Sequence, residues 1–287
     1  MKKILSVSLI FIMLNLLIGC DDMRNPEASK QENINNYRNT IQKFADECEY
    51  DVEFILDEND FFSGEIQLKH SGYVTFLHNS LNLYLSPGEN LEIYVNALNF
   101  LGSLYFRGSL GGINSYLKEQ ESAVFFDKDY YLFSEADFVQ KMKELLNEKI
   151  QLLEAKNFDK SFTDLEKERI RYSIAERVAR YPIYQKRIYP GREYRPGKVF
   201  TDFLASYSLN KVDLFSTSDY RAFLLNYVYL QGGQKRLGRN HSDEIVDYVL
   251  STVTDPTIKN FLLTEIVFRH IRENNGLKGA EHLLQVF

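Results

Sequence analysis

The sequence contains two cysteines, and the residues around each of them indicate how its thiol should react. Cys20 ends the apolar run Leu16-Leu17-Ile18-Gly19-Cys20, whereas Cys48 lies in the acidic run Asp46-Glu47-Cys48-Glu49. A thiol reacts as its thiolate, and neighbouring carboxylates disfavour that anion. We therefore expect Cys48 to be an unreactive thiol.

The segment before Cys20 has the layout of a secretory signal. Lys2 and Lys3 form a positive start, and residues 4–18 form an apolar run that is too short to span a bilayer comfortably. The Leu-x-x-Gly-Cys ending resembles the bacterial lipoprotein cleavage box. That resemblance implies cleavage before Cys20, a diacylglyceryl thioether on its sulfur and acylation of the new amino terminus. The alternative is an ordinary signal peptide followed by a chance cysteine.

Lipidation of Cys20 would leave Cys48 without a partner in the chain, because there are only two cysteines. A disulfide framework, a Cys-x-x-Cys redox pair and a thiolate zinc site are then excluded. We accordingly expect no resident cofactor.

The other candidate catalytic residues follow no catalytic spacing. The histidines form neither a His-x-x-x-His pair nor a His-Glu-x-x-His motif, so they give no support for a metal site; they are His70, His78, His241, His270 and His282. A Gly-x-Ser-x-Gly motif is absent, and paired carboxylates cannot be recognised from sequence alone. We therefore assign no catalytic, cofactor-binding or metal-binding residue, and a non-enzymatic protein is favoured.

A glycine-rich segment, residues 107–116, could be read as a phosphate-binding loop. It lacks both the Gly-Lys-Ser/Thr ending and the spacing of a dinucleotide-binding loop. The glycines instead predict a sharp turn from the last strand into the first helix.

Charge is distributed unevenly along the chain. Residues 44–66 hold nine acidic and no basic side chains, whereas residues 169–198 hold nine basic side chains, two acidic ones and five tyrosines. Basic groups interleaved with aromatic rings can bind nucleic acid, anionic glycan or lipid headgroups. We favour a solvated helix face whose arginine stems cover apolar surface, and docking against the acidic segment is a third interpretation. Any polyanion contact is expected at Arg187, Arg192 and Arg195.

The composition limits the class of partner. Cleavage after Gly19 leaves 268 of 287 residues and a formal charge of −8, which argues against nucleic acid as a partner. The chain has 19 Tyr and 21 Phe but no Trp. Such rings can stack on a ligand, although we expect most of them to lie in the core.

Residues 44–107 alternate between apolar and polar side chains. The alternation predicts half-buried antiparallel strands in runs near 52–56, 64–68, 72–77, 81–85 and 91–95. Ser86-Pro87-Gly88-Glu89-Asn90 separates the last two runs and predicts a type II turn. Strands of this number and spacing favour a small β-sandwich.

Helical spacing follows residue 108. Helix starts are predicted at five capping positions: Ser134, Thr163, Ser218, Ser242 and Asp255, the last followed by Pro256. Pro182 is expected to end or kink the second of these helices, and Gly232-Gly233 to end the third. The last two helices are expected to form an antiparallel pair.

The strand and turn motifs resemble a known envelope family. The residues that carry the resemblance are Gly64-x-x-x-Leu68, Gly72-Tyr73, Leu83-Tyr84-Leu85-Ser86-Pro87-Gly88-Glu89-x-Leu91, Phe106-x-Gly108 and Asn114-x-Tyr116-Leu117. They resemble the amino-terminal part of lipoproteins that carry a thioredoxin-like, TlpA-type disulfide reductase domain at the carboxyl end. The resemblance implies a β-sandwich followed by helices over residues 51–287. This chain departs from the family because it holds no Cys-x-x-Cys and stops where the thioredoxin domain would begin, so no catalytic residue is carried over.

The sequence therefore predicts an α+β protein: an N-terminal antiparallel β-sandwich followed by an all-helical C-terminal region. The expected parts are a signal peptide (1–19), a lipidated tether (20–43), a β-sandwich domain (44–110) and a helical domain (111–287). The expected function is a non-enzymatic binding or scaffold module, lipid-anchored in the bacterial cell envelope on the periplasmic or surface side, with an envelope protein or a glycan as partner. The alternatives are a split or truncated thiol-disulfide oxidoreductase and a glycan-binding accessory lipoprotein.

We predict that Cys20→Ala releases the protein from the membrane, because the substitution removes the sulfur that would carry the lipid. Fractionation of cells after a salt wash measures the distribution. Equal retention of wild type and variant in the membrane fraction would show that the anchor is not on Cys20.

Overall fold

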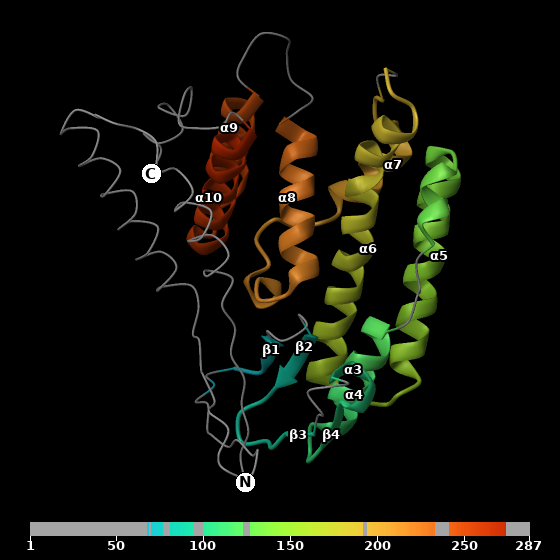
Figure 1. The fold of residues 1–287 in the computed structure, drawn as a ribbon, viewed down its shortest axis with the longest axis vertical. Coiled ribbons are helices and arrows are strands. Elements are labelled where there is room, and N and C mark those ends of the chain that lie inside the picture. The colour runs from blue at the N-terminus through green and yellow to red at the C-terminus, as the bar shows by residue number, and fades with distance from the viewer. Residues whose placement is uncertain are drawn as a thin grey trace, which may run out of the picture. The chain divides into compact units, whose positions relative to one another are not determined.

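The computed structural model describes residues 68, 70–76, 81–94, 100–122, 127–191, 194–232 and 241–273 (Figure 1). Cys20, Cys48 and the acidic segment 44–66 lie outside these residues. The chain divides into two compact units, Met1–Ser122 and Ala123–Phe287, which are described separately. Strands lie in the first unit and the longest helices in the second, as the change of period in the sequence predicts.

Four short strands lie in the described part of the first unit. Strand β1 (Gly72–Phe76) pairs antiparallel with β2 (Leu81–Leu85), and Val74 lies opposite Leu83. Strand β3 (Glu92–Tyr94) pairs antiparallel with β4 (Tyr105–Arg107). The short helix α3 (Phe100–Ser103) precedes β4, and helix α4 (Gly111–Ser122) follows it.

A β-sandwich is not evident in these described residues, which corrects that expectation there. The strands form two separate two-stranded sheets, and α4 packs against both β2 and β4. A helix therefore covers apolar strand surface that a second sheet would cover in a sandwich. Strand β2 is buried along its whole length, including Asn82 and Tyr84, so its alternation does not mark a solvated face. The runs predicted near 52–56 and 64–67 lie outside the described residues.

The two predicted turns of the first unit are present. Gly88 has φ +78°, and the Glu89 N–H donates to the Ser86 carbonyl at 3.2 Å, as a type II turn requires. Gly108 has φ +88°, and a Cβ there would lie only 2.7 Å from the Asn90 carbonyl oxygen. Glycine at position 108 thus lets the chain leave β4 close to the preceding turn and enter α4.

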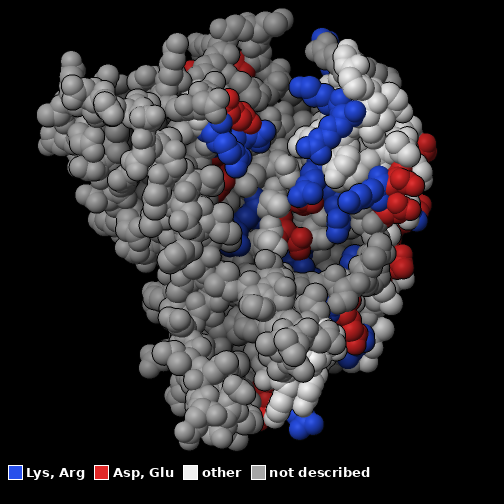
Figure 2. Space-filling view, in the orientation of Figure 1, with Lys and Arg blue, Asp and Glu red and all other residues white. Residues whose placement is uncertain are grey.

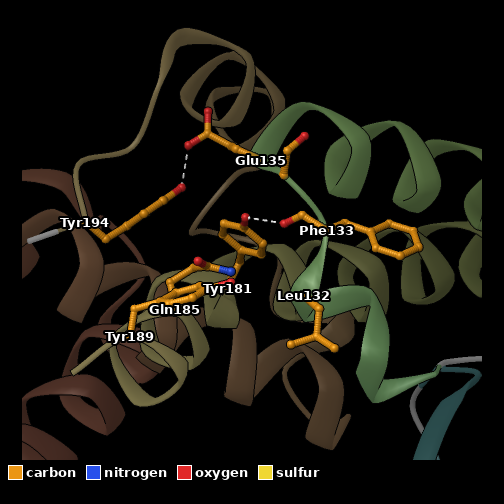
Figure 3. Close-up of a pocket in the computed structure, with 8 residues that line it drawn as sticks. Leu132, Phe133, Glu135, Tyr181, Gln185, Tyr189 and Tyr194 are labelled. Atoms are coloured by element: carbon orange, nitrogen blue, oxygen red, sulfur yellow. Dashed lines mark hydrogen bonds between the residues drawn. The ribbon is translucent and has the colours of Figure 1, made fainter. Parts of the chain in front are cut away.

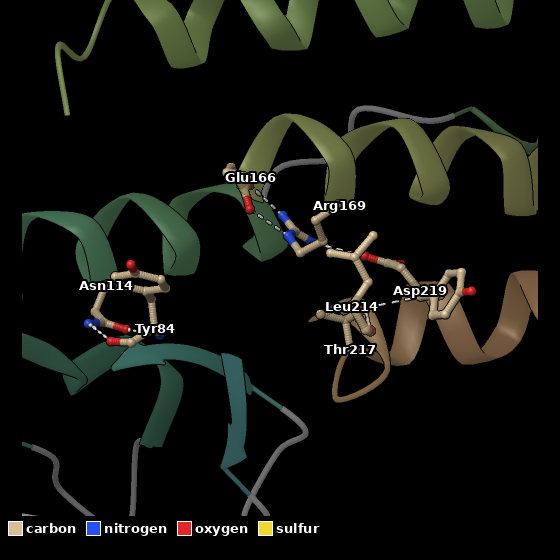
Figure 4. Close-up of polar contacts among 8 residues, drawn as sticks. Tyr84, Asn114, Glu166, Arg169, Leu214, Thr217 and Asp219 are labelled. Atoms are coloured by element: carbon tan, nitrogen blue, oxygen red, sulfur yellow. Dashed lines mark hydrogen bonds and ion pairs between the residues drawn. The ribbon is translucent and has the colours of Figure 1, made fainter. Parts of the chain in front are cut away.

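Asn114 joins helix α4 to strand β2. Its side-chain nitrogen donates to the carbonyls of Tyr84 and Leu110, each at 3.0 Å, and its side-chain oxygen accepts from the Tyr84 N–H at 2.8 Å (Figure 4). The amide therefore satisfies both backbone groups of one strand residue, as a neighbouring strand would. Asn114 is fully buried, so these bonds have no competition from water.

The second unit is helical in its described part. Its α-helices are α5 (Glu135–Glu154), α6 (Lys160–Ile188), α7 (Lys198–Ala205), α8 (Ser218–Gly232), α9 (His241–Thr252) and α10 (Pro256–Glu273), with 3₁₀ turns at Lys128–Leu132 and Val212–Leu214. Helix α6 packs against α5 and α8, α8 packs against α9, and α9 packs against α10 (Figure 1). No helix in the described residues combines the length and the apolar composition needed to cross a bilayer.

Most of the predicted helix starts are correct. The Ser134 oxygen accepts from the Asp137 N–H, and Asp255 accepts from the Ile258 N–H at 2.9 Å, so both residues are N-caps. Thr163 is not a cap, which corrects that prediction. Asp159 caps α6 instead, four residues earlier, by accepting from the Phe162 N–H at 2.9 Å.

Helix α6 continues through Pro182 to Ile188, so of the two expected effects, an end or a kink, the proline does not end the helix. An interior proline costs a helix roughly 3 kcal/mol. Packing of the following turn offsets this cost. Tyr184 stacks on Tyr131 with ring centroids 3.9 Å apart, and Gln185 donates to the Tyr131 carbonyl at 2.7 Å.

Many aromatic rings of the second unit lie in its core, as the sequence analysis expected. Buried tyrosines need a hydrogen-bond partner for the hydroxyl group. The Tyr172 hydroxyl donates to the Ser208 carbonyl at 2.9 Å, and the Tyr181 hydroxyl donates to the Phe133 carbonyl at 2.7 Å. Both bonds tie helix α6 to non-helical backbone.

We predict that Asn114→Leu destabilises the first unit by about 2 to 4 kcal/mol, because each buried backbone group left without a partner costs roughly 1 to 3 kcal/mol. Denaturant unfolding followed by circular dichroism measures the change. Ser115→Ala, on the same helix, is the control and should unfold like the wild type. Equal unfolding of the Asn114 variant and the control would contradict the bridging role.

Candidate functional site

The residues predicted to contact a polyanion have different surroundings. Arg187 is exposed and lies over the Tyr184 ring, with its guanidinium carbon 5.7 Å from the ring centroid. Arg195 is exposed, and Arg192 lies outside the described residues. Lys and Arg side chains gather over α6 and α8 in the second unit, with acidic side chains among them (Figure 2). A polyanion contact at these three arginines stays a prediction.

Several basic side chains of residues 169–198 interact within the protein. Arg171 lies over the Tyr207 ring at 5.7 Å, and Arg180 forms an ion pair with Glu176 on the preceding turn. Arg169 is buried. For these positions the structure agrees with the interpretation that arginine stems cover apolar surface and ring faces.

The most buried charges form an ion-paired cluster between α6 and α8. Arg169 donates to both carboxylate oxygens of Glu166 at 2.7 and 2.8 Å and to Asp219 at 2.8 Å (Figure 4). Glu166 has no exposed surface, so its charge depends on this two-pronged contact. The arrangement is typical of a buried charge that the protein must neutralise internally.

The cluster continues along α6 to Glu176. Asn226 donates to its carboxylate at 3.1 Å, and burial raises the pKa of Glu176 although Arg180 opposes that shift. On α5, burial lowers the pKa of Lys149 to about 8, and the charges of Arg169 and Arg177 add to the effect. A lysine with a lowered pKa can be a nucleophile. Here it neighbours charges that already pair with one another, which favours a structural role.

A cavity of about 290 Å³ lies where α5 begins and α6 ends (Figure 3). Leu132, Phe133, Ser134 and Glu135 line it from the segment that enters α5. Tyr181, Gln185, Tyr189 and Tyr194 line it from the end of α6 and the segment that follows. A concave site lined by aromatic rings with a few polar groups is typical of a small-molecule binding site.

Glu135 is the acidic group of this cavity. Its carboxylate accepts a hydrogen bond from the Tyr194 hydroxyl and from the Gly197 N–H, the latter at 3.1 and 3.0 Å to its two oxygens. Burial raises the pKa of Tyr194 well above its usual range, and the bond to Glu135 raises it further. Tyr194 is therefore a neutral phenol, and its hydroxyl group donates a hydrogen bond to Glu135.

The rim of the cavity is apolar and exposed. Leu132 lies on one side and Tyr189 on the other, and both are exposed, whereas the Phe133 ring is exposed but points away from Tyr181 (Figure 3). Exposed apolar side chains at the mouth of a cavity offer contact area to a ligand, although others, such as Leu152 and Leu250, are exposed elsewhere. This combination makes the cavity the candidate binding site.

Sequence analysis identified only some of the residues of this site. Tyr181, Tyr189 and Tyr194 are among the five tyrosines noted in the basic segment 169–198, and Glu135 directly follows the predicted capping residue Ser134. Leu132 and Phe133 were not singled out. About fifty residues separate the two halves of the cavity, and no spacing pattern indicates that they meet.

Among the residues that the structure describes, no cluster of three or more His, Cys, Asp or Glu side chains is arranged to hold a metal ion. Comparisons with known proteins add no further assignment. No protein-family model matches the chain, and neither does any curated protein or solved structure. The candidate site therefore rests on its own geometry.

We predict that Arg169→Met lowers the free energy of unfolding by about 3 to 5 kcal/mol, because it leaves the buried Glu166 carboxylate uncompensated. The double variant with Glu166→Gln should recover part of the loss. Chemical denaturation measures both. Lys160→Ala breaks an exposed ion pair with Asp164 and is the control, with no measurable change expected. A similar loss in the single and double variants would contradict the pairing.

A pH-dependent prediction follows from Lys149. Between pH 8 and pH 10.5 the unfolded chain holds a proton on Lys149 that the folded chain releases, so this group contributes stability that rises with pH over that window. Lys149→Met should therefore be more stable than wild type below pH 8, and the difference should shrink toward pH 10.5. Thermal unfolding across this range tests it, with the exposed Lys143→Met as the control. A difference that does not vary with pH would argue against the lowered pKa.

Proposed function

We propose that this chain is a non-enzymatic, lipid-anchored binding module of the bacterial cell envelope. The observation that supports a binding role is the cavity between Leu132–Glu135 and the end of α6, with its exposed apolar rim and single carboxylate. The role in the envelope is inferred from the lipoprotein-like segment that ends at Cys20.

The two units have different roles in this proposal. The helical second unit carries the ligand site, and the tether after Cys20 would hold it away from the membrane. The first unit would be a small β module, which we propose is related to the sandwich of TlpA-type reductases. In that case the chain would present a ligand or a partner to a separately encoded enzyme.

A reductase activity of this chain is not part of the proposal. Disulfide exchange needs an attacking thiolate and, for rapid turnover, a second thiol nearby. Cys48 would be the sole free thiol after lipidation, and it lies among carboxylates. Turnover of a disulfide substrate at the rate of a thioredoxin control, lost in Cys48→Ser, would overturn the non-enzymatic assignment.

Ligand-dependent stabilisation tests the binding role. A panel of amines, amino acids, sugars and short peptides would be screened for compounds that raise the melting temperature of the chain from residue 21 onward, since a ligand that binds only the folded state stabilises it. We expect at least one compound to act on wild type and to lose its effect in Tyr189→Ala, which removes a ring from the cavity wall.

A matched control is available on α6, the helix that Tyr189 follows. Ile183 is 41% exposed and does not line the cavity, whereas Tyr189 is 43% exposed and does. Ile183→Ala should keep the ligand effect. Compounds that act equally on both variants, or no active compound at all, would contradict binding in this cavity.

A further inference from the structure

Several hydrogen-bond donors of the cavity lining are already used within the protein, whereas acceptor sites are still available to a ligand. The Tyr194 hydroxyl donates a hydrogen bond to Glu135, and the Tyr181 hydroxyl donates one to the Phe133 carbonyl. One amide hydrogen of Gln185 is used by the Tyr131 carbonyl. A phenol has a single proton to donate, whereas a carboxylate offers about four lone-pair sites.

Glu135 keeps acceptor capacity after its contacts within the protein. The Tyr194 hydroxyl and the Gly197 N–H supply two donors, fewer than the lone-pair sites of a carboxylate. Its negative charge lies beside the tyrosines that line the same cavity (Figure 3). A carboxylate that lines a cavity attracts a positively charged donor.

The partial charges at the helix ends around the cavity also bear on which ligand charge it favours. Helix α6 ends at Ile188, and its C-terminal carbonyls carry a negative partial charge beside the lining residues Gln185 and Tyr189. Two positive N-terminal ends are already met by groups of the protein: Ser134 and Asp137 exchange hydrogen bonds at the start of α5, and Glu135 accepts from Gly197, the N-cap of α7. The charged ends that would attract an anion are therefore occupied by groups of the protein.

The same aromatic layer already accepts one cation. The Arg187 guanidinium lies over the face of Tyr184, and Tyr184 stacks on Tyr131 at 3.9 Å between ring centroids. Tyr131 in turn lies 6.4 Å from the ring of Tyr181, which lines the cavity.

We propose that the cavity binds an organic cation, an alkylammonium group whose N–H donors reach Glu135 while its carbon chain lies against Tyr189 and Leu132. This inference rests on the proposed function and deepens it by naming the ligand class. An anion would meet the Glu135 charge and few unused donors. A neutral polyol has no positive charge to offset the free-energy cost of removing water from the Glu135 carboxylate.

The test uses matched probes of one shape and different charge. Butylammonium, 1-butanol and butyrate would be titrated into the chain from residue 21 onward and followed by ligand-observed NMR. Butylammonium should bind at least about tenfold more tightly than the other two, because a hydrogen bond to a charged group such as the Glu135 carboxylate contributes roughly 1.5 to 3 kcal/mol. Tetramethylammonium, which has no N–H donor, should bind more weakly than butylammonium.

Variants separate the charge from the shape of the site. Glu135→Gln keeps an oxygen that can accept from Tyr194 and Gly197, and it should weaken butylammonium binding about tenfold or more while the melting temperature stays close to wild type. Glu148→Gln, an exposed acid on the same helix, is the control and should bind like wild type.

The outcomes distinguish this inference from the proposed function. Equal binding of butylammonium and butanol, or unchanged binding in Glu135→Gln, would overturn the cation assignment. Binding of a methyl glucoside that is lost in Tyr189→Ala, without amine binding, would overturn the ligand class and keep the cavity as a binding site. Failure of every probe and every compound of the wider panel would overturn both.

Discussion

The need to satisfy buried tyrosine hydroxyls organises the second unit. A phenol that is removed from water without a partner is costly, so each buried ring of this kind must meet a polar group. The hydroxyls of Tyr172 and Tyr181 on α6 reach backbone carbonyls of Ser208 and Phe133 in irregular segments. The bond from Tyr181 fixes the segment that enters α5, and that segment forms one wall of the cavity.

Helix α6 combines this role with the neutralisation of buried charge. It supplies Glu166, Arg169 and Glu176, which pair with side chains of α6 and α8 rather than with solvent. Such pairs contribute little net stability when compared with well-packed apolar groups, but they restrict which partner a helix can accept. The contact of Arg169 with Asp219 thus favours one register of α6 against α8.

The sequence predicted local features better than the assembly. The turn at Gly88, the caps at Ser134 and Asp255 and the start of α8 follow from neighbouring residues and were correct. Pro182 does not end α6, because the packing of Tyr184 and Gln185 overrides the tendency of proline to stop a helix. A β-sandwich was predicted but is not evident in the described residues, because alternation of apolar and polar residues in β2 does not show whether a helix or a second sheet covers the strand. The cavity could not be predicted, since its walls meet only through tertiary contacts.

The amide of Asn114 has a further consequence for association between molecules. An uncovered strand edge can recruit a strand from another chain and begin aggregation. In β2, both main-chain groups of Tyr84 are already bonded to Asn114, so an incoming strand would have to displace a buried side chain before it could pair there. One asparagine on α4 therefore opposes edge-to-edge association at this point of the strand.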